Sequence, residues 1–257
     1  MRTEEQLKRQ LAVALSLVLL VGTQAMAKDI KFSSTIGQGA FKDLSKEAGA
    51  AISYRNTAPA EPLGITGFDA GVEVSAIHIK SNSDYWNAAF GNKNDAPSYL
   101  VLPKIRVRKG LPFGIDLGAM YSYVPDSNIK LYGVEVSKAI LDGTLATPAI
   151  GIRGTYTRLA GVNDLDLQTA GIDASISKGF LFLTPYAGAG EVWVNSKAKG
   201  NLQQAAITAG SPLASENIWQ PRVFAGLKIS PLPLFGITAE AEYQVRPIYS
   251  LKAALSF

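Results

Sequence analysis

Charged side chains recur at every second position along several segments of this 257-residue chain. Lys104, Arg106 and Arg108 form one such row, and Glu240 and Glu242 form another. Residues spaced by two lie on the same face of a β-strand, so each row is predicted to point to one side of a sheet. The charged residues of these polar faces are seven acids and seven bases: Glu73, Asp116, Glu135, Asp173, Glu191, Glu240 and Glu242, with Lys104, Arg106, Arg108, Arg153, Arg222, Lys228 and Lys252.

Two kinds of chemistry are open to such a set of side chains. If they line a narrow aqueous channel, rings of arginine and glutamate select small polar solutes by charge. If they face one another without water, they must form ion pairs, because an unpaired buried charge is costly. The sequence leaves both hypotheses open: a narrow channel, or a structural barrel with an ion-paired lumen.

Catalysis would have to centre on His78, the only histidine of the chain. Ser81, Ser83 and Asp84 follow it, and these are residue types that build a nucleophile with its base. Strand alternation, however, places His78 with the apolar face of its segment, which indicates an interfacial histidine. We therefore predict that the chain is not an enzyme and keep a hydrolase using His78 as the less favoured alternative.

The residues that could bind a metal are few. The chain has no cysteine and one histidine, so only scattered carboxylates remain as ligands. We predict no metal site and no cofactor. The formal net charge of +4 is small, so it predicts no nucleic-acid partner and indicates no lipopolysaccharide-binding patch.

The beginning of the chain is typical of an exported protein. Arg2, Lys8 and Arg9 precede an apolar run from Leu11 to Val21, and Ala25-Met26-Ala27 follows as a cleavage site. This order predicts a secretory signal peptide over residues 1–27. The apolar run is shorter than the roughly 20 residues that a membrane-spanning helix needs.

From residue 67 onward, ten segments alternate between apolar and polar residues, as strands with two different faces do. In the seventh segment, Tyr186, Val192 and Val194 are assigned to the apolar outward face and Glu191 to the polar face. Trp193 breaks that pattern, so a bulge near Gly188 to Gly190 is predicted. The ten segments are Phe68–Ile79, Ser98–Arg108, Phe113–Val124, Ile129–Ile140, Thr147–Leu159, Leu165–Lys178, Phe182–Asn195, Ile218–Ile229, Phe235–Arg246 and Ile248–Phe257.

The last segment carries a row of apolar residues on one face: Tyr249, Leu251, Ala253, Leu255 and Phe257. A C-terminal strand with a terminal phenylalanine on its apolar face resembles the assembly signal of Gram-negative outer-membrane β-barrel proteins. The resemblance implies an all-β, antiparallel up-and-down transmembrane barrel in the outer membrane. It also implies outer-membrane lipid and lipopolysaccharide as surroundings, and periplasmic chaperones and the barrel-assembly machinery as partners.

Loop lengths and aromatic residues agree with that expectation. Bacterial barrels have an even number of strands, with long loops on the outer side and short turns on the inner side. Ten strands place the two longest connections, Lys80 to Pro97 and Ser196 to Asn217, on the outer side. Tyrosine and tryptophan fall near the outer strand ends and phenylalanine near the inner ends, with Tyr186 as the exception.

Residues 28–66 are predicted to form an N-terminal extension that enters the lumen as a plug or lies beneath it. Apolar residues at helical spacing predict a short helix over Ala40 to Tyr54, and Pro59 and Pro62 indicate an extended linker. The alternative makes Ala48 to Tyr54 and Ile30 to Thr35 two further strands of a twelve-stranded barrel.

A third functional hypothesis is lateral transfer of an apolar ligand through the barrel wall. It rests on the possible plug and on Pro103, which lies within a strand and removes a ladder hydrogen bond. This layout resembles that of outer-membrane fatty-acid transporters. The sequence does not indicate an oligomeric state.

Overall fold

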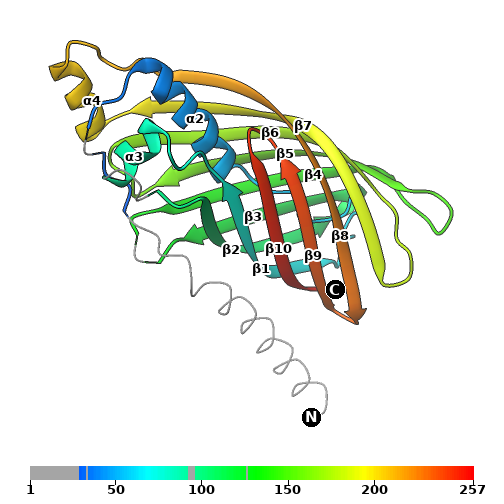
Figure 1. The fold of residues 1–257 in the computed structure, drawn as a ribbon. Helices are drawn as coiled ribbons and strands as arrows, with labels where there is room; N and C mark the ends of the chain where they lie inside the picture. Colours follow the sequence, from blue (N-terminus) through cyan, green and yellow to red (C-terminus); the bar gives the residue numbers. More distant parts are fainter. Residues whose placement is uncertain (1–28, 33, 92–95, 126) are drawn as a thin grey trace.

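A computed structural model describes residues 29–32, 34–91, 96–125 and 127–257. Ten antiparallel strands form a closed barrel in which each strand pairs with the next and β1 pairs with β10 (Figure 1). The predicted signal peptide, residues 1–27, lies outside the described residues. The strands are β1 Phe68–His78, β2 Tyr99–Leu111, β3 Ile115–Tyr123, β4 Lys130–Asp142, β5 Ala149–Ala160, β6 Leu165–Ser177, β7 Leu183–Ala198, β8 Glu216–Leu232, β9 Phe235–Tyr243 and β10 Pro247–Ser256.

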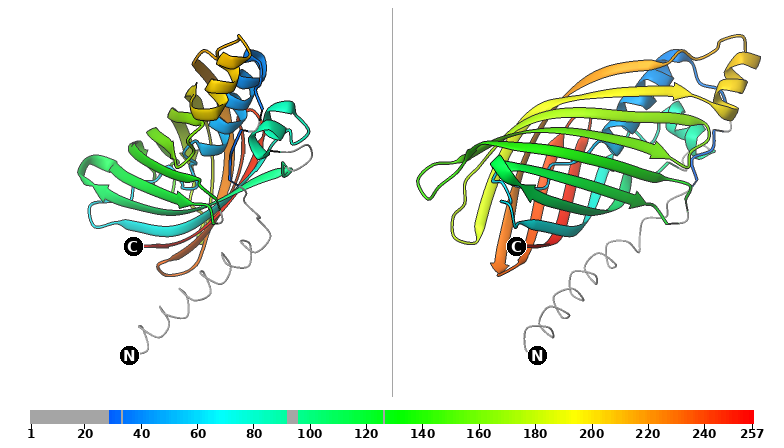
Figure 2. Two further views of the ribbon diagram at one scale, coloured as in Figure 1. Left: turned by 90° about the vertical axis from the view of Figure 1, so that its left-hand side faces the viewer. Right: turned by 180° about the vertical axis from the view of Figure 1, so that it is seen from behind.

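The two ends of the barrel differ in their connections. At one end, called here the loop end, lie the long connections after β1 and β7, which contain the helices α3 (Asp84–Phe90) and α4 (Gly200–Thr208). At the other end, the turn end, lie the start of β1, the C-terminus and short turns, among them the 3₁₀ turn η1 (Pro112–Gly114). Figures 1 and 2 show α3 and α4 gathered at the loop end together with the N-terminal helix α2 (Gln38–Ile52).

The N-terminal segment lies inside the barrel. Residues 30–32 cross the loop end, where the Lys31 amide donates to the Ala89 carbonyl of α3 at 3.0 Å. Helix α2 then packs against β5 to β8, and its Phe41, Leu44 and Ile52 are buried. Residues 53–66 continue from α2 to the turn end, where the chain joins β1.

The ten predicted strands are confirmed, each within a few residues of its predicted bounds. The twelve-strand alternative is wrong, because residues 48–52 belong to α2 and residues 30–32 form no strand. Helices α3 and α4 were not predicted. None of the helices in the described part of the chain is long and apolar enough to cross a membrane.

Candidate functional site in the barrel lumen

The turn-end half of the lumen contains a continuous ion-pair network. Lys104 Nζ lies 2.8 Å from Glu73 Oε1, and the Arg106 guanidinium lies 3.0 Å from Glu73 and 3.3 Å from Glu135. Strand alternation produces this arrangement, since the basic row of β2 faces acids that β1 and β4 point into the same space. Further pairs are Arg108 with Asp116 and Glu135 (both 2.8 Å), Arg153 with Asp173 (2.7 Å) and Glu135 (3.5 Å), Arg222 with Asp173, and Lys252 with Asp69 (3.0 Å).

The linker after α2 passes through this network. Three consecutive backbone carbonyls of the linker each accept a hydrogen bond from a different arginine of the wall. The wall is therefore bonded to the linker from several sides. The pairs are Tyr54 O with Arg222 Nη1 (2.8 Å), Arg55 O with Arg153 Nη1 (2.8 Å) and Asn56 O with Arg106 Nη1 (3.1 Å).

Linker side chains extend the network. The fully buried Arg55 forms an ion pair with Glu242 at 2.9 Å, and Thr57 Oγ1 donates to Glu73 at 2.8 Å. The Arg106 guanidinium also stacks over the Tyr54 ring, 4.7 Å from its centroid, as a cation–π contact. Arg55 was not predicted, because its charge lies in the linker rather than in a strand.

Glu240 differs from the other lumen acids. No cation of the described chain lies within ion-pair distance of it. Instead, its Oε2 accepts hydrogen bonds from the Thr57 amide and from the Tyr186 hydroxyl, both at 2.9 Å. Tyr186 lies over Gly226, where a β-carbon would collide with its ring, so the glycine makes room for this tyrosine inside the lumen.

The loop-end half of the lumen is apolar. Helices α2 and α3 form one core with inward side chains of the strands, such as Leu131, Leu167 and Val192. A buried carboxylate, Glu47 of α2, anchors this part. It accepts from Trp86 Nε1 at 2.7 Å and Tyr85 Oη at 3.2 Å, and Arg246 Nε lies 2.7 Å away. Burial raises the pKa of the Tyr85 phenol, which therefore stays protonated as a donor.

The prediction for Glu191 was wrong. Glu191 is exposed on the outer face of β7, whereas Tyr186, Val192 and Val194 face inward, and β7 has no bulge. The physical reason is that α2 lies inside the lumen. Val194 points inward because it packs against this helix at Gly49. Apolar residues near the loop end therefore face inward, contrary to the simple rule that the lumen is polar.

Twelve other predicted lumen residues point inward and are buried: Glu73, Lys104, Arg106, Arg108, Asp116, Glu135, Arg153, Asp173, Arg222, Glu240, Glu242 and Lys252. Lys228 is half-buried and lines a polar vestibule of about 330 Å³ at the turn end. Linker residues such as Pro59 and Leu63 form part of its lining.

The C-terminal strand closes the barrel. Phe68 and Phe257 exchange backbone hydrogen bonds of 2.8 and 3.0 Å, and their rings lie 5.7 Å apart. Tyr249, Leu251 and Phe257 are exposed on the outer face, and Ala253 and Leu255 lie partly exposed in the same row.

His78 and the acidic side chains are the candidate catalytic and metal-binding residues. His78 lies beside Tyr99, its cross-strand partner, with ring centroids 5.3 Å apart. Within the described residues, no group of three or more acidic or histidine side chains could hold a metal ion.

The surface distribution is the reverse of that of a soluble protein. Isoleucine, leucine and valine are exposed around the strands, while eleven of the fourteen predicted charged residues are buried in ion pairs. Tyrosines such as Tyr121 and Tyr132 stand exposed among them. A closed barrel with an apolar outer band and a polar interior fits a bilayer. The chain is an outer-membrane-type β-barrel.

Known proteins with a similar fold share little sequence with this chain. No family model and no curated protein matches the sequence. Similar solved structures include OprG from Pseudomonas aeruginosa (10% identity, 78% of this chain and 99% of that chain covered, TM-score 0.39) and the N-terminal β-barrel domain of OprF from the same organism (13%, 76% and 99%, 0.36). Ail from Yersinia pestis is another (15%, 74% and 97%, 0.28). At these values the likeness concerns the fold alone.

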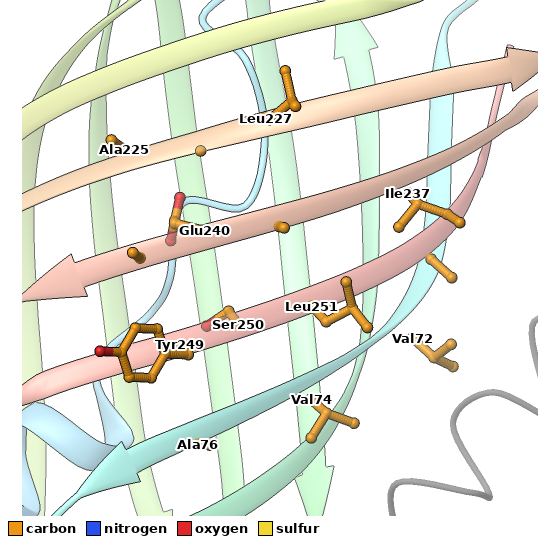
Figure 3. Close-up of a pocket in the computed structure, with 14 residues that line it drawn as sticks. Val72, Val74, Ala76, Ala225, Leu227, Ile237, Glu240, Tyr249, Ser250 and Leu251 are labelled. Carbon is orange, nitrogen blue, oxygen red and sulfur yellow. The ribbon is translucent and has the colours of Figure 1, made fainter.

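One part of the outer wall is hollowed. Small residues of β8, β9, β10 and β1 form an apolar groove of about 700 Å³ between larger outward side chains such as Leu227, Leu251 and Val74 (Figure 3). Glu240 belongs to β9, one of these strands, but its side chain points to the lumen side, toward the linker.

Proposed function

We propose that the protein is an integral barrel of the Gram-negative outer membrane whose axis is closed by its own N-terminal segment, residues 29–66. The observation that carries the proposal is the bonding of carbonyls 54–56 to three wall arginines. It favours the ion-paired structural barrel over the open channel. The loop end is the cell surface, because outer-membrane barrels have long outer loops and short periplasmic turns.

A cysteine placed in the lumen tests this closure. The chain has no native cysteine, and Ser53 is 1% exposed in the lumen. We expect Ser53→Cys to resist a small hydrophilic thiol reagent in the folded barrel and to react after denaturation. Ser211→Cys in the exposed β7–β8 connection is the matched control and should react at once. Rapid reaction of Ser53→Cys in the folded protein would mean that the lumen is open to water.

The exposed C-terminal row of Tyr249 to Phe257 supports recognition by the barrel-assembly machinery, as the sequence predicts. His78 supports an interfacial role rather than catalysis, because its ring packs edge to face against Tyr99 at the outer face. Loss of a hydrolytic activity in His78→Ala would overturn that part of the proposal.

A second candidate function, lateral exchange of an apolar ligand, is favoured by the seam between β2 and β3. The β2–β3 ladder runs from Leu111–Ile115 only to Ile105–Tyr121, although β2 continues to Tyr99 along β1. Ser122 Oγ donates to the Pro103 carbonyl at 2.6 Å. The N and O atoms of a strand residue point to the same neighbour, so the missing N–H of Pro103 also lies on the β3 side.

Restoring that donor tests the lateral route. Pro103→Val would supply the absent N–H and is expected to slow uptake of an apolar probe from the bilayer. Val107→Ile, on the outward face of β2 where the ladder to β3 is complete, restores no donor and serves as the control. An unchanged uptake rate in Pro103→Val would exclude this seam as the route.

A further inference from the structure

An apolar cavity lies behind the β2–β3 seam. Its volume is about 50 Å³, and it is bounded by Leu100 and Leu102 of β2, Trp86 and Ala89 of α3, and Ala48 of α2 among others. No polar group lines it among the described residues. Cavities with such a lining stay dry and take up apolar molecules instead of water.

The mouth of the seam lies at the level of the exposed tyrosines. Tyr121 and Tyr123 stand exposed on the β3 side, and the His78–Tyr99 pair stands on the side of β1 and β2. Amphipathic rings of this kind occupy the head-group region of a bilayer. A lipid-like molecule could therefore keep its polar head among these rings while its tail passes inward between the strands.

We propose that this cavity binds the end of a single unbranched alkyl chain that enters through the β2–β3 seam. The volume decides the ligand class, since an apolar cavity that binds benzene has a volume of about 150 Å³, three times the space present. Two or three methylene groups fit, and a ring does not. The inference rests on the lateral route proposed above and adds its ligand and its binding residues.

Trp86 provides a direct reporter because it lines the cavity and is 1% exposed. The chain has three tryptophans, so Trp193→Phe with Trp219→Phe leaves Trp86 alone. An alkanoic acid brominated at its terminal carbon should quench Trp86 in the folded full-length protein, with saturation. A phospholipid brominated at the same position distinguishes the source: quenching by the free acid only assigns a fatty acid, and quenching by both assigns any lipid chain.

The control reporter is Trp219, which is 64% exposed on the outer wall, kept alone by Trp86→Phe with Trp193→Phe. Ala89→Leu fills the cavity from α3 and should raise the half-quenching concentration for Trp86 about tenfold, since two methylenes lose their site. Trp219 quenching should not change. Ala48→Leu fills the same cavity from α2 and repeats the test if Ala89→Leu does not fold, as judged by heat-modifiable migration.

Quenching of Trp219 by the free acid without quenching of Trp86 would overturn the proposal. Equal quenching of Trp86 in the parent and both filled variants would overturn it as well. Quenching of Trp86 that Pro103→Val does not slow would retain the cavity and reject the seam as its access. None of these outcomes depends on whether ions pass along the axis, so a failure here is distinguishable from a failure of the closed-barrel proposal.

Discussion

Gly49 on α2 lies directly against Val194 on β7, and a β-carbon on Gly49 would come within 2.5 Å of Val194 Cγ1. The contact fixes the helix against the inner wall at the loop end. It exists because one residue has no side chain and the other points inward rather than to the lipid.

Gly49→Leu should therefore push α2 away from the wall. Overpacking of this kind costs about 1–3 kcal/mol, and the displaced helix should become sensitive to added protease. Gly39→Leu in the same helix is the control, because no atom lies within 4 Å of a β-carbon there. Equal protease sensitivity of the two variants would show that α2 is not packed as described.

The ion-pair network makes a second prediction at Asp173. This buried carboxylate accepts from both Arg153 and Arg222, so Asp173→Asn leaves two buried cations short of a partner. We expect a loss of about 3–5 kcal/mol in the free energy of unfolding, measured by urea titration in lipid vesicles.

Asp166→Asn is the matched control for Asp173→Asn. Asp166 pairs with Lys199 and Arg158 near the protein surface, where such pairs contribute about 0–1 kcal/mol. If the two substitutions cost the same, the buried network contributes little to stability.

Backbone strain at the turn end gives a third prediction. Leu181 has a φ of 55° and a fully exposed side chain, so its left-handed conformation is not compensated by burial. Leu181→Gly should raise the free energy of unfolding by about 1 kcal/mol. Leu145 is equally exposed but has no positive φ, so Leu145→Gly should give no gain. A lower free energy of unfolding in both variants would contradict the interpretation that the backbone of Leu181 is strained.

The path of the N-terminal segment predicts its topology in cells. Lys31 lies at the loop end and is exposed, whereas Leu145 lies at a turn. Lys31→Cys should react with a membrane-impermeant thiol reagent on intact cells, and Leu145→Cys should react only after lysis. The reverse pattern would invert the proposed orientation.

The barrel itself could be predicted from the sequence because its strands follow the two-residue period. Acidic partners for the row of Lys104, Arg106 and Arg108 could be expected without knowledge of register, since all the inward faces share one small space. Which acids pair with the row could not be predicted. Glu191 and Val194 could not be assigned correctly, because their orientation depends on where α2 packs. A helix-filled lumen can be recognised in a sequence when two features occur together: a predicted N-terminal helix, and a strand such as β7 with apolar residues where polar ones are expected.

The contacts between the linker and the wall could not be predicted from the sequence. Tyr54, Arg55 and Asn56 bind the wall mainly through backbone carbonyls, which every residue has, so no pattern of side chains marks them.

The central claim is that the N-terminal segment closes the barrel axis, and planar-bilayer conductance of the refolded protein tests it most directly. Residues 28–257 should show no discrete conductance steps while migrating as a folded, heat-modifiable barrel. A variant lacking residues 28–66 should show steps if it folds, and charge reversal at Arg106 should then shift its ion selectivity. Steady conductance steps from the chain with its N-terminal segment intact would contradict the account.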